Sequence, residues 1–294
     1  MDDSRYYLET SSVRRLWRTL PRIKRDLHCR VFSSYLVMFE LLSGLTKEDY
    51  ALRREILKSC VDSKLPIDWR APTDITAAAF TATEYHDNRS DELKKLLSVV
   101  MRCQDLAAAE VECSARNLQA SLAGLREEDR VLRDHEVRSR TEMGQLFRRD
   151  YTPEERKLEY DKLLGQTTSE EGAAIKRKMQ TTAEFWEVYI TARDLAPLLL
   201  GDSLQAKILA MLQSYDGSIS YHLRAAALAQ SITLLRGETP ARNDFFDIAH
   251  FLYLNDATIM VSDDKLIHRL CAELWPSRIL ASEDFLHLKK AVAL

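Results

Sequence analysis

The sequence is poor in the two residues that make tight turns. It contains only 8 Gly and 7 Pro among 294 residues, although 46% of its residues are apolar and can fill a real core. A fold built from many short strands needs more turn residues, so an all-β architecture is disfavoured. We expect an ordered chain of long helices joined by short connections.

Cysteine motifs, leader sequences and membrane segments are also missing. The five cysteines form no CxxC pair, which speaks against a zinc ribbon or a disulfide framework: Cys29, Cys60, Cys103, Cys113 and Cys271. No basic segment followed by an apolar one opens the chain, and no run approaches the roughly 18 apolar residues of a spanning helix. We expect mostly buried, reduced thiols in a cytoplasmic protein that does not associate with membranes.

Several motifs of well-known enzyme classes do not occur. The chain has no GxxxxGK[ST], GxGxxG, HExxH or GxSxG, so nucleotide-driven motors, dinucleotide enzymes, zincins and serine hydrolases lack support. The net charge of −3 argues against a surface that is basic all over, but it leaves room for a local basic patch.

What the chain does contain is an alternation of strand and helix at its two ends. Short strands are predicted at 5–9, 30–33, 65–69, 257–261 and 278–281. Helical periodicity or caps predict helices at 13–20, 35–45, 50–63, 245–254 and 265–274, and a last helix capped by Ser282. This alternation predicts an α/β domain with a parallel sheet, assembled from residues 1–75 and 238–294.

The middle of the chain, residues 76–237, shows helical periodicity alone. Within it, residues 88–180 hold 18 basic and 18 acidic residues, which favours a solvated helical hairpin or coiled coil. A turn predicted at 237–240 ends this insertion. We therefore expect a discontinuous α/β domain that carries a long, all-helical insertion.

Acidic residues follow two of the predicted strands. Glu9 ends the first strand, and Asp263 and Asp264 follow the strand at 257–261. Because ligands of open α/β sheets bind at the carboxyl ends of the strands, we expect these carboxylates to face one crevice.

Two further acids, Glu40 and Asp247, lie inside apolar helices. A carboxylate buried in this way is costly unless it is paired, protonated or bound to a cation. Mg²⁺ and Mn²⁺ prefer oxygen ligands and leave positions open for a phosphate. Such an ion activates water and neutralises charge on a scissile phosphate.

Each acid also has a structural interpretation. Glu9 can simply follow a strand into a turn, Glu40 can meet an arginine in the core, and Asp263 or Asp264 can cap the next helix. For Asp244 an N-cap is favoured over a ligand. Helix caps do not explain acids inside apolar helices, so the set as a whole favours a metal site.

The charges between Glu9 and Asp26 are all basic: Arg14, Arg15, Arg18, Arg22, Lys24 and Arg25. On the helix beside the acids, Arg14, Arg15 and Arg18 are candidates for contacts with nucleic-acid phosphates. The alternative is a solvated basic face.

Three other side chains are candidates for supporting roles. His250 falls on about the same helical face as Asp247, so it can orient a carboxylate or touch substrate, although a satisfied core histidine is the favoured interpretation. Thr10 and Ser262 can bond the carboxylates or a water on the metal, or can be turn residues.

The order of these residues resembles the pattern of PIN-domain nucleases. The resemblance rests on Glu9-Thr10-Ser11 after the first strand, Glu40 in FELLSG, Asp247 in NDFFDIAHFLYL and Asp264 in VSDDKL. It covers roughly residues 4–70 and 238–290.

The resemblance implies a three-layer α/β/α fold and Mg²⁺- or Mn²⁺-dependent hydrolysis of RNA phosphodiester bonds, often by toxins, defence proteins or RNA-processing factors. Catalysis and metal binding would fall to Glu9, Glu40, Asp247 and Asp264, with Asp263 as a further ligand.

Two departures from the family pattern keep alternatives open. Glu9 stands where the family usually has Asp, and the insertion is unusually long. The alternatives are an inactive PIN-like scaffold whose charged helices bind a partner, and a nuclease directed at DNA, including single-stranded DNA. The insertion would serve a regulatory protein partner or a homo-oligomer.

Overall fold

This computed structural model describes residues 4–26, 30–81, 88–118, 121–150, 152–155, 158, 181, 184–185, 187–197, 199, 205–236 and 241–292. Cys29, the turn predicted at 237–240 and most of 151–180 lie outside the described residues. So does the side chain of Lys24.

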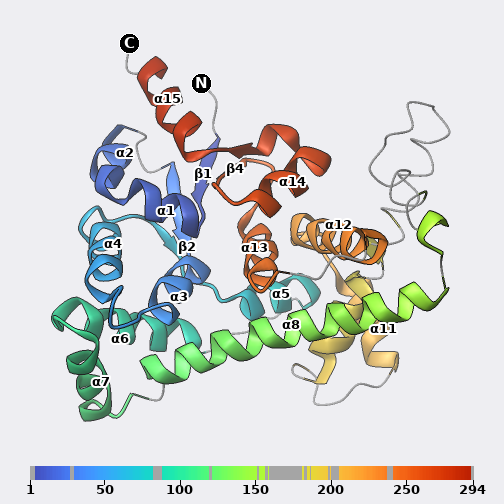
Figure 1. The fold of residues 1–294 in the computed structure, drawn as a ribbon, viewed down its shortest axis with the longest axis horizontal. Coiled ribbons are helices and arrows are strands. Elements are labelled where there is room, and N and C mark those ends of the chain that lie inside the picture. The colour runs from blue at the N-terminus through green and yellow to red at the C-terminus, as the bar shows by residue number, and fades with distance from the viewer. Residues whose placement is uncertain are drawn as a thin grey trace.

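A parallel sheet joins the two ends of the chain (Figure 1). Its five strands lie in the order β3-β2-β1-β4-β5: β1 (Arg5–Leu8), β2 (Val31–Ser34), β3 (Ile67–Asp68), β4 (Thr258–Val261) and β5 (Ile279–Leu280). In the register of the central strand, Tyr7 stands opposite Phe32 on one side and Met260 on the other. The predicted α/β class and the strand contribution from both ends are confirmed.

The N-terminal helices match the predictions at 35–45 and 50–63, but the helix predicted at 13–20 is divided into two α-helices and a 3₁₀ turn. They are α1 (Thr10–Leu16), a 3₁₀ turn η1 (Trp17–Thr19), α2 (Leu20–Asp26), α3 (Tyr35–Ser43), α4 (Tyr50–Asp62) and α5 (Pro72–Phe80). The hydroxyl of Ser34 caps α3 by accepting a bond from the Val37 N–H at 3.4 Å, and Gly44 ends that helix. Local capping chemistry therefore sets the boundaries of α3.

The insertion contributes α6 (Arg89–Arg102), α7 (Leu106–Ala115), α8 (Leu122–Asp150), α11 (Gln205–Ser214) and α12 (Ser220–Arg236). The start of the charged segment is not a solvated hairpin, because α6 buries Leu93, Leu96 and Val100 against α3 and α4. Its apolar stripe outweighs its many charges. In Figure 1 the long helix α8 runs beneath α3, α13 and α12, and it contacts all three.

The C-terminal part comprises α13 (Asp244–Ala249), the 3₁₀ turns η2 (His250–Tyr253) and η3 (Pro276–Arg278), α14 (Lys265–Leu274) and α15 (Ser282–Val292). The helix predicted at 245–254 is thus a short α-helix continued by a 3₁₀ turn. Asp244 is not the N-cap that was predicted: Asn243 occupies that position, and Asp244 accepts a bond from the Ala241 N–H at 3.1 Å from inside the first turn.

The direction of strand addition reverses between β1 and β4. The chain moves outward from β1 through β2 to β3, and later in the opposite direction from β4 to β5. Right-handed crossovers then put the helices after β1 and β2 on one face and α14 on the other. In Figure 1, α2 and α4 lie on one side of the strands and α14 lies on the other, which is compatible with a three-layer α/β/α architecture.

Buried side chains of both chain ends and of the insertion form one continuous hydrophobic core. The described cysteines Cys60, Cys103, Cys113 and Cys271 are free thiols, and all but Cys103 are buried. No helix in the described part of the chain combines the length and apolar character that a membrane span requires.

Candidate active site

The predicted acids after the strands meet where the strand order reverses. Glu9 follows β1, Asp263 and Asp264 follow the adjacent β4, and the Glu9 N–H donates to the carbonyl of Val261 at 3.2 Å. A reversal of this kind opens a crevice at the carboxyl ends of two neighbouring strands, which is the usual ligand position in open α/β sheets.

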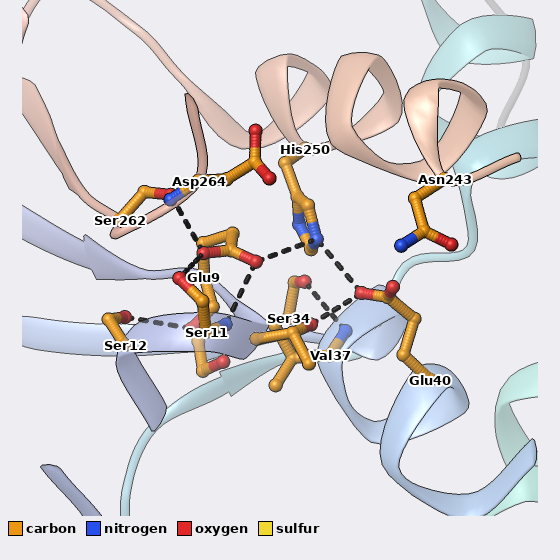
Figure 2. Close-up of polar contacts among 12 residues, drawn as sticks. Glu9, Ser11, Ser12, Ser34, Val37, Glu40, Asn243, His250, Ser262 and Asp264 are labelled. Carbon is orange, nitrogen blue, oxygen red and sulfur yellow. Dashed lines mark hydrogen bonds and ion pairs between the residues drawn. The ribbon is translucent and has the colours of Figure 1, made fainter. Parts of the chain in front are cut away.

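Glu9 is held by hydroxyl and backbone donors (Figure 2). Its carboxylate accepts bonds from the Ser11 N–H at 2.9 Å, the Ser11 hydroxyl at 2.6 Å and the Ser262 hydroxyl at 2.9 Å. Burial raises the pKa of Glu9 above its ordinary value, although His250 and Ser11 act in the opposite direction. Glu9 therefore caps α1, and Ser262 bonds an acid as predicted.

Glu40, in contrast, is surrounded by strong donors. It accepts bonds from His250 Nε2 at 3.0 Å and from the Thr10 hydroxyl, and Arg133 Nη2 lies 3.6 Å from its Oε1. Burial alone would raise the pKa of Glu40, but His250, Thr10 and Arg133 together lower it. The alternative that Glu40 meets an arginine in the core is thus realised.

His250 is fully buried and links Glu40 to the sheet. Figure 2 shows its ring between Glu9 and Glu40. Its Nδ1 lies 2.6 Å from the Tyr7 hydroxyl, which in turn lies 2.8 Å from the Ser34 hydroxyl. Burial raises the pKa of Tyr7 well above its usual range, so Tyr7 keeps its proton for this bond. His250 therefore orients the Glu40 carboxylate, and both of its ring nitrogens have hydrogen-bond partners within the core.

Asp247 differs from both glutamates. Its side chain is 9% exposed, and within the described residues no hydrogen bond or ion pair reaches its carboxylate. Burial, followed by the charges of Asp264, Glu40 and Glu9, raises the pKa of Asp247 to about 9. Without a cation this carboxyl keeps its proton at neutral pH, because burial and the neighbouring carboxylates both oppose its ionisation.

The two acids after β4 point to different partners. Asp264 Oδ1 caps α14 by accepting the N–H groups of Leu266 at 2.7 Å and Ile267 at 3.1 Å. Asp263 accepts the Ser282 N–H at 3.0 Å and lies 3.5 Å from Arg15 Nη1. The charge of Asp264 helps to raise the pKa of Asp247, whereas the Asp263 side chain is directed toward α15 and α1.

Of the predicted basic side chains, Arg15 contacts one of the acids, Asp263. Arg14, Arg15 and Arg18 are exposed on α1 and η1. Arg18 stacks on the Trp17 ring at 4.9 Å, while Arg15 reaches both Asp263 and Glu283. Arg15 also lines a groove of about 400 Å³ together with Arg22 and His287.

Sequence reasoning missed Arg133, which α8 of the insertion brings to Glu40. Its Nε donates to Asp129 at 3.0 Å, its Nη1 donates to the side-chain oxygen of Asn243, and its guanidinium lies 4.3 Å from the centre of the Phe246 ring. In the sequence Arg133 is one of many charges on a charged helix, so no local signal singles it out.

The oxygen donors fit the chemistry of Mg²⁺ or Mn²⁺, but they do not form a many-ligand cage. In the part of the chain that the structure describes, no group of three or more His, Cys, Asp or Glu side chains is placed to hold a metal. Mg²⁺ commonly uses only one or two protein carboxylates and completes its coordination with waters and substrate phosphates. Among the charges that raise the pKa of Asp247, Asp264 has the largest effect, so these two carboxyl groups are the nearest candidates for such a pair.

No family model matches the chain, and neither a curated protein nor a solved structure matches it significantly. Membership of the PIN family therefore stays a hypothesis, based on the parallel sheet and on the order of the acidic residues.

Proposed function

We propose that this protein is a metal-dependent nuclease of the PIN-like type that hydrolyses phosphodiester bonds of RNA. The observation that carries the proposal is Asp247, a carboxyl group that is nine-tenths buried, has no partner within the described residues and lies among other carboxylates. Placing a carboxylate there costs free energy that a bound cation removes.

The position of the acids supports the same proposal. Glu9, Asp264 and Asp247 gather where the strand order reverses between β1 and β4. The PIN-domain pattern that this chain resembles likewise has an acid after the first strand and an aspartate after a later strand. The remaining acid, Glu40, comes from α3 and shares His250 with Glu9.

A divalent ion held by Asp247 and Asp264 would neutralise charge on the scissile phosphate and activate water. Glu9 is suited to accept the proton of the attacking water, because a carboxylate whose pKa is raised is a better general base near neutral pH. Ser11 and Ser262 fix the position of that carboxylate, and His250 fixes Glu40.

The basic residues of α1 and α2 supply a path for the substrate backbone. Arg15 and Arg22 line a groove together with His287 and Glu283, and Arg15 also contacts Asp263. Guanidinium groups in such a groove neutralise phosphates without reading base sequence, as a nuclease of broad specificity needs.

The test compares cleavage of labelled single-stranded RNA and single-stranded DNA by the wild type and the Asp247→Asn/Asp264→Asn variant, with Mn²⁺, Mg²⁺ or EDTA. We expect RNA cleavage that needs the metal and is lost in the variant. Asp62→Asn, at an exposed position in α4, is the matched control and keeps full activity. Cleavage that survives EDTA or the double substitution contradicts the proposal.

A second candidate is an inactive PIN-like scaffold that binds a protein partner through the helical insertion. It is favoured by the pairing of Glu40 with His250 and Arg133 and by the capping role of Asp264. A scaffold is indifferent to Mn²⁺, whereas the nuclease gains thermal stability from it, so a melting curve with and without Mn²⁺ separates the two.

A further inference from the structure

The carboxylates of the candidate site fall into two groups, which differ in whether a positively charged side chain of the protein lies beside them. Glu40 has His250 at 3.0 Å and the Arg133 guanidinium at 3.6 Å. Within the described residues no Lys, Arg or His nitrogen forms an ion pair with the Asp247 carboxylate, and the Asp264 carboxylate accepts bonds from the backbone N–H groups of Leu266 and Ile267. The protein therefore supplies positive charge to one half of the site and leaves the other half without it.

Three side chains of the described residues present oxygen atoms to the Arg133 guanidinium. Its guanidinium meets the carboxylates of Asp129 and Glu40 and the amide oxygen of Asn243. These oxygens come from α8, from α3 and from the residue before α13. Carboxylate and amide oxygens are also the ligands that hard divalent cations prefer.

The Arg133 side chain is well enclosed in this position. It is 13% exposed, as is the Glu40 side chain, and it lies over the face of Phe246. An ion pair screened from water in this way is hard for a solvent cation to replace, because a guanidinium is permanently charged and keeps its fork geometry.

We propose that Arg133 is the resident cation of the Glu40 half of the site, so that the protein binds a single divalent ion, at Asp247 and Asp264, where a two-metal nuclease would bind two. The inference rests on the proposed nuclease function. It assigns the helical insertion a direct part in the site, because α8 delivers a fixed positive charge that does not depend on metal supply.

The experiment counts bound Mn²⁺ per chain, by electron paramagnetic resonance of free Mn²⁺ and by titration calorimetry, in the wild type and in Arg133→Ala. We expect one ion in the wild type. Arg133→Ala leaves the oxygens of Asp129, Asn243 and Glu40 around the vacated position, and we expect it to bind a second ion there.

Three further variants control this result. Arg130→Ala removes an exposed guanidinium from the same helix, where it pairs with Glu127 and Asp134, and we expect it to keep one ion. Arg133→Lys retains the charge and also keeps one ion. Adding Glu40→Gln to Arg133→Ala returns the count from two to one.

Each outcome decides between the inference and the function beneath it. Two ions in the wild type, or a single ion in a folded Arg133→Ala variant, overturn the role of Arg133 while the nuclease proposal stands. If Arg133→Ala does not fold, a count of two ions in the wild type or in Arg133→Lys still overturns the role of Arg133. If neither the wild type nor any folded variant binds Mn²⁺, the nuclease proposal itself fails.

Discussion

The two halves of the acidic site solve the same electrostatic problem in opposite ways. Glu40 is buried together with donors that hold its pKa below the ordinary value, whereas Asp247 is buried without them and has a pKa raised to about 9. The first arrangement contributes to stability, and the second costs stability unless a ligand is present. Carboxylates of similar burial can therefore serve the fold or the function, depending on their neighbours.

The largest effect that this comparison predicts is on catalysis. We expect Asp247→Asn to lower kcat by about a hundredfold or more, because the substitution removes one of the two negative charges that would hold the divalent ion. Steady-state cleavage of labelled RNA in Mn²⁺ measures it. A variant that retains more than a tenth of wild-type activity would place the metal elsewhere.

The Glu40 half should respond to the equivalent substitution by losing stability. Glu40→Gln takes the charged acceptor away from His250 and Arg133, and we expect a loss of about 1–3 kcal/mol in the free energy of unfolding. Urea unfolding at neutral pH measures it. Since the pKa of Glu40 is lowered in the fold, the wild-type advantage is present above about pH 4.5, the ordinary value, and is lost as the pH falls through the folded pKa. A difference in the free energy of unfolding between the wild type and Glu40→Gln that stays the same at acidic pH would contradict the pairing of Glu40 with His250 and Arg133.

In the absence of metal, Asp247→Asn should raise the stability of the fold, whereas Glu40→Gln lowers it. The pKa of this carboxyl is 3.8 ordinarily and about 9 in the fold, so the folded chain keeps a proton that the unfolded chain releases. Stability from this group is complete below pH 3.8 and falls as the pH rises toward 9. The amide cannot ionise, so we expect Asp247→Asn to raise Tm on the order of 5 °C at pH 8, with a smaller gain at pH 5.

Differential scanning calorimetry in EDTA, across that pH range, tests this expectation. The matched control is Asp62→Asn, whose Tm difference from the wild type should not change with pH. A gain for Asp247→Asn that is equal at pH 5 and pH 8 would mean that its ionisation is not what limits stability.

The smallest effect concerns the support behind His250. Tyr7→Phe removes the hydroxyl that lies between His250 and Ser34, and we expect a loss of about 1 kcal/mol in the free energy of unfolding. Tyr6→Phe, on the next residue of β1, should stay within about 0.5 kcal/mol of the wild type. Equal losses of unfolding free energy in Tyr7→Phe and Tyr6→Phe would show that the hydrogen bonds of the Tyr7 hydroxyl do not hold His250 in place.

Elements set by local chemistry were predictable from the sequence. The helix predicted at 265–274 is α14 to the residue, because Asp264 caps its start and Ile267, Leu270 and Cys271 form its buried stripe. The boundaries at α13 were less predictable. There the chain changes from an α-helix to a 3₁₀ turn at His250, where buried contacts with Tyr7 and Glu40 outweigh helical periodicity.

The sequence by itself determined the α/β alternation, the parallel sheet drawn from both chain ends and the list of acids to examine, because capping, periodicity and strand polarity are local properties. Only the tertiary structure decided how those acids differ. Glu40 has a cationic partner because α8 crosses beneath α3 and α13 and brings Arg133 to it, whereas no ion pair reaches Asp247 within the described residues. Pairing between charges so far apart along the chain follows from packing, which no local pattern encodes.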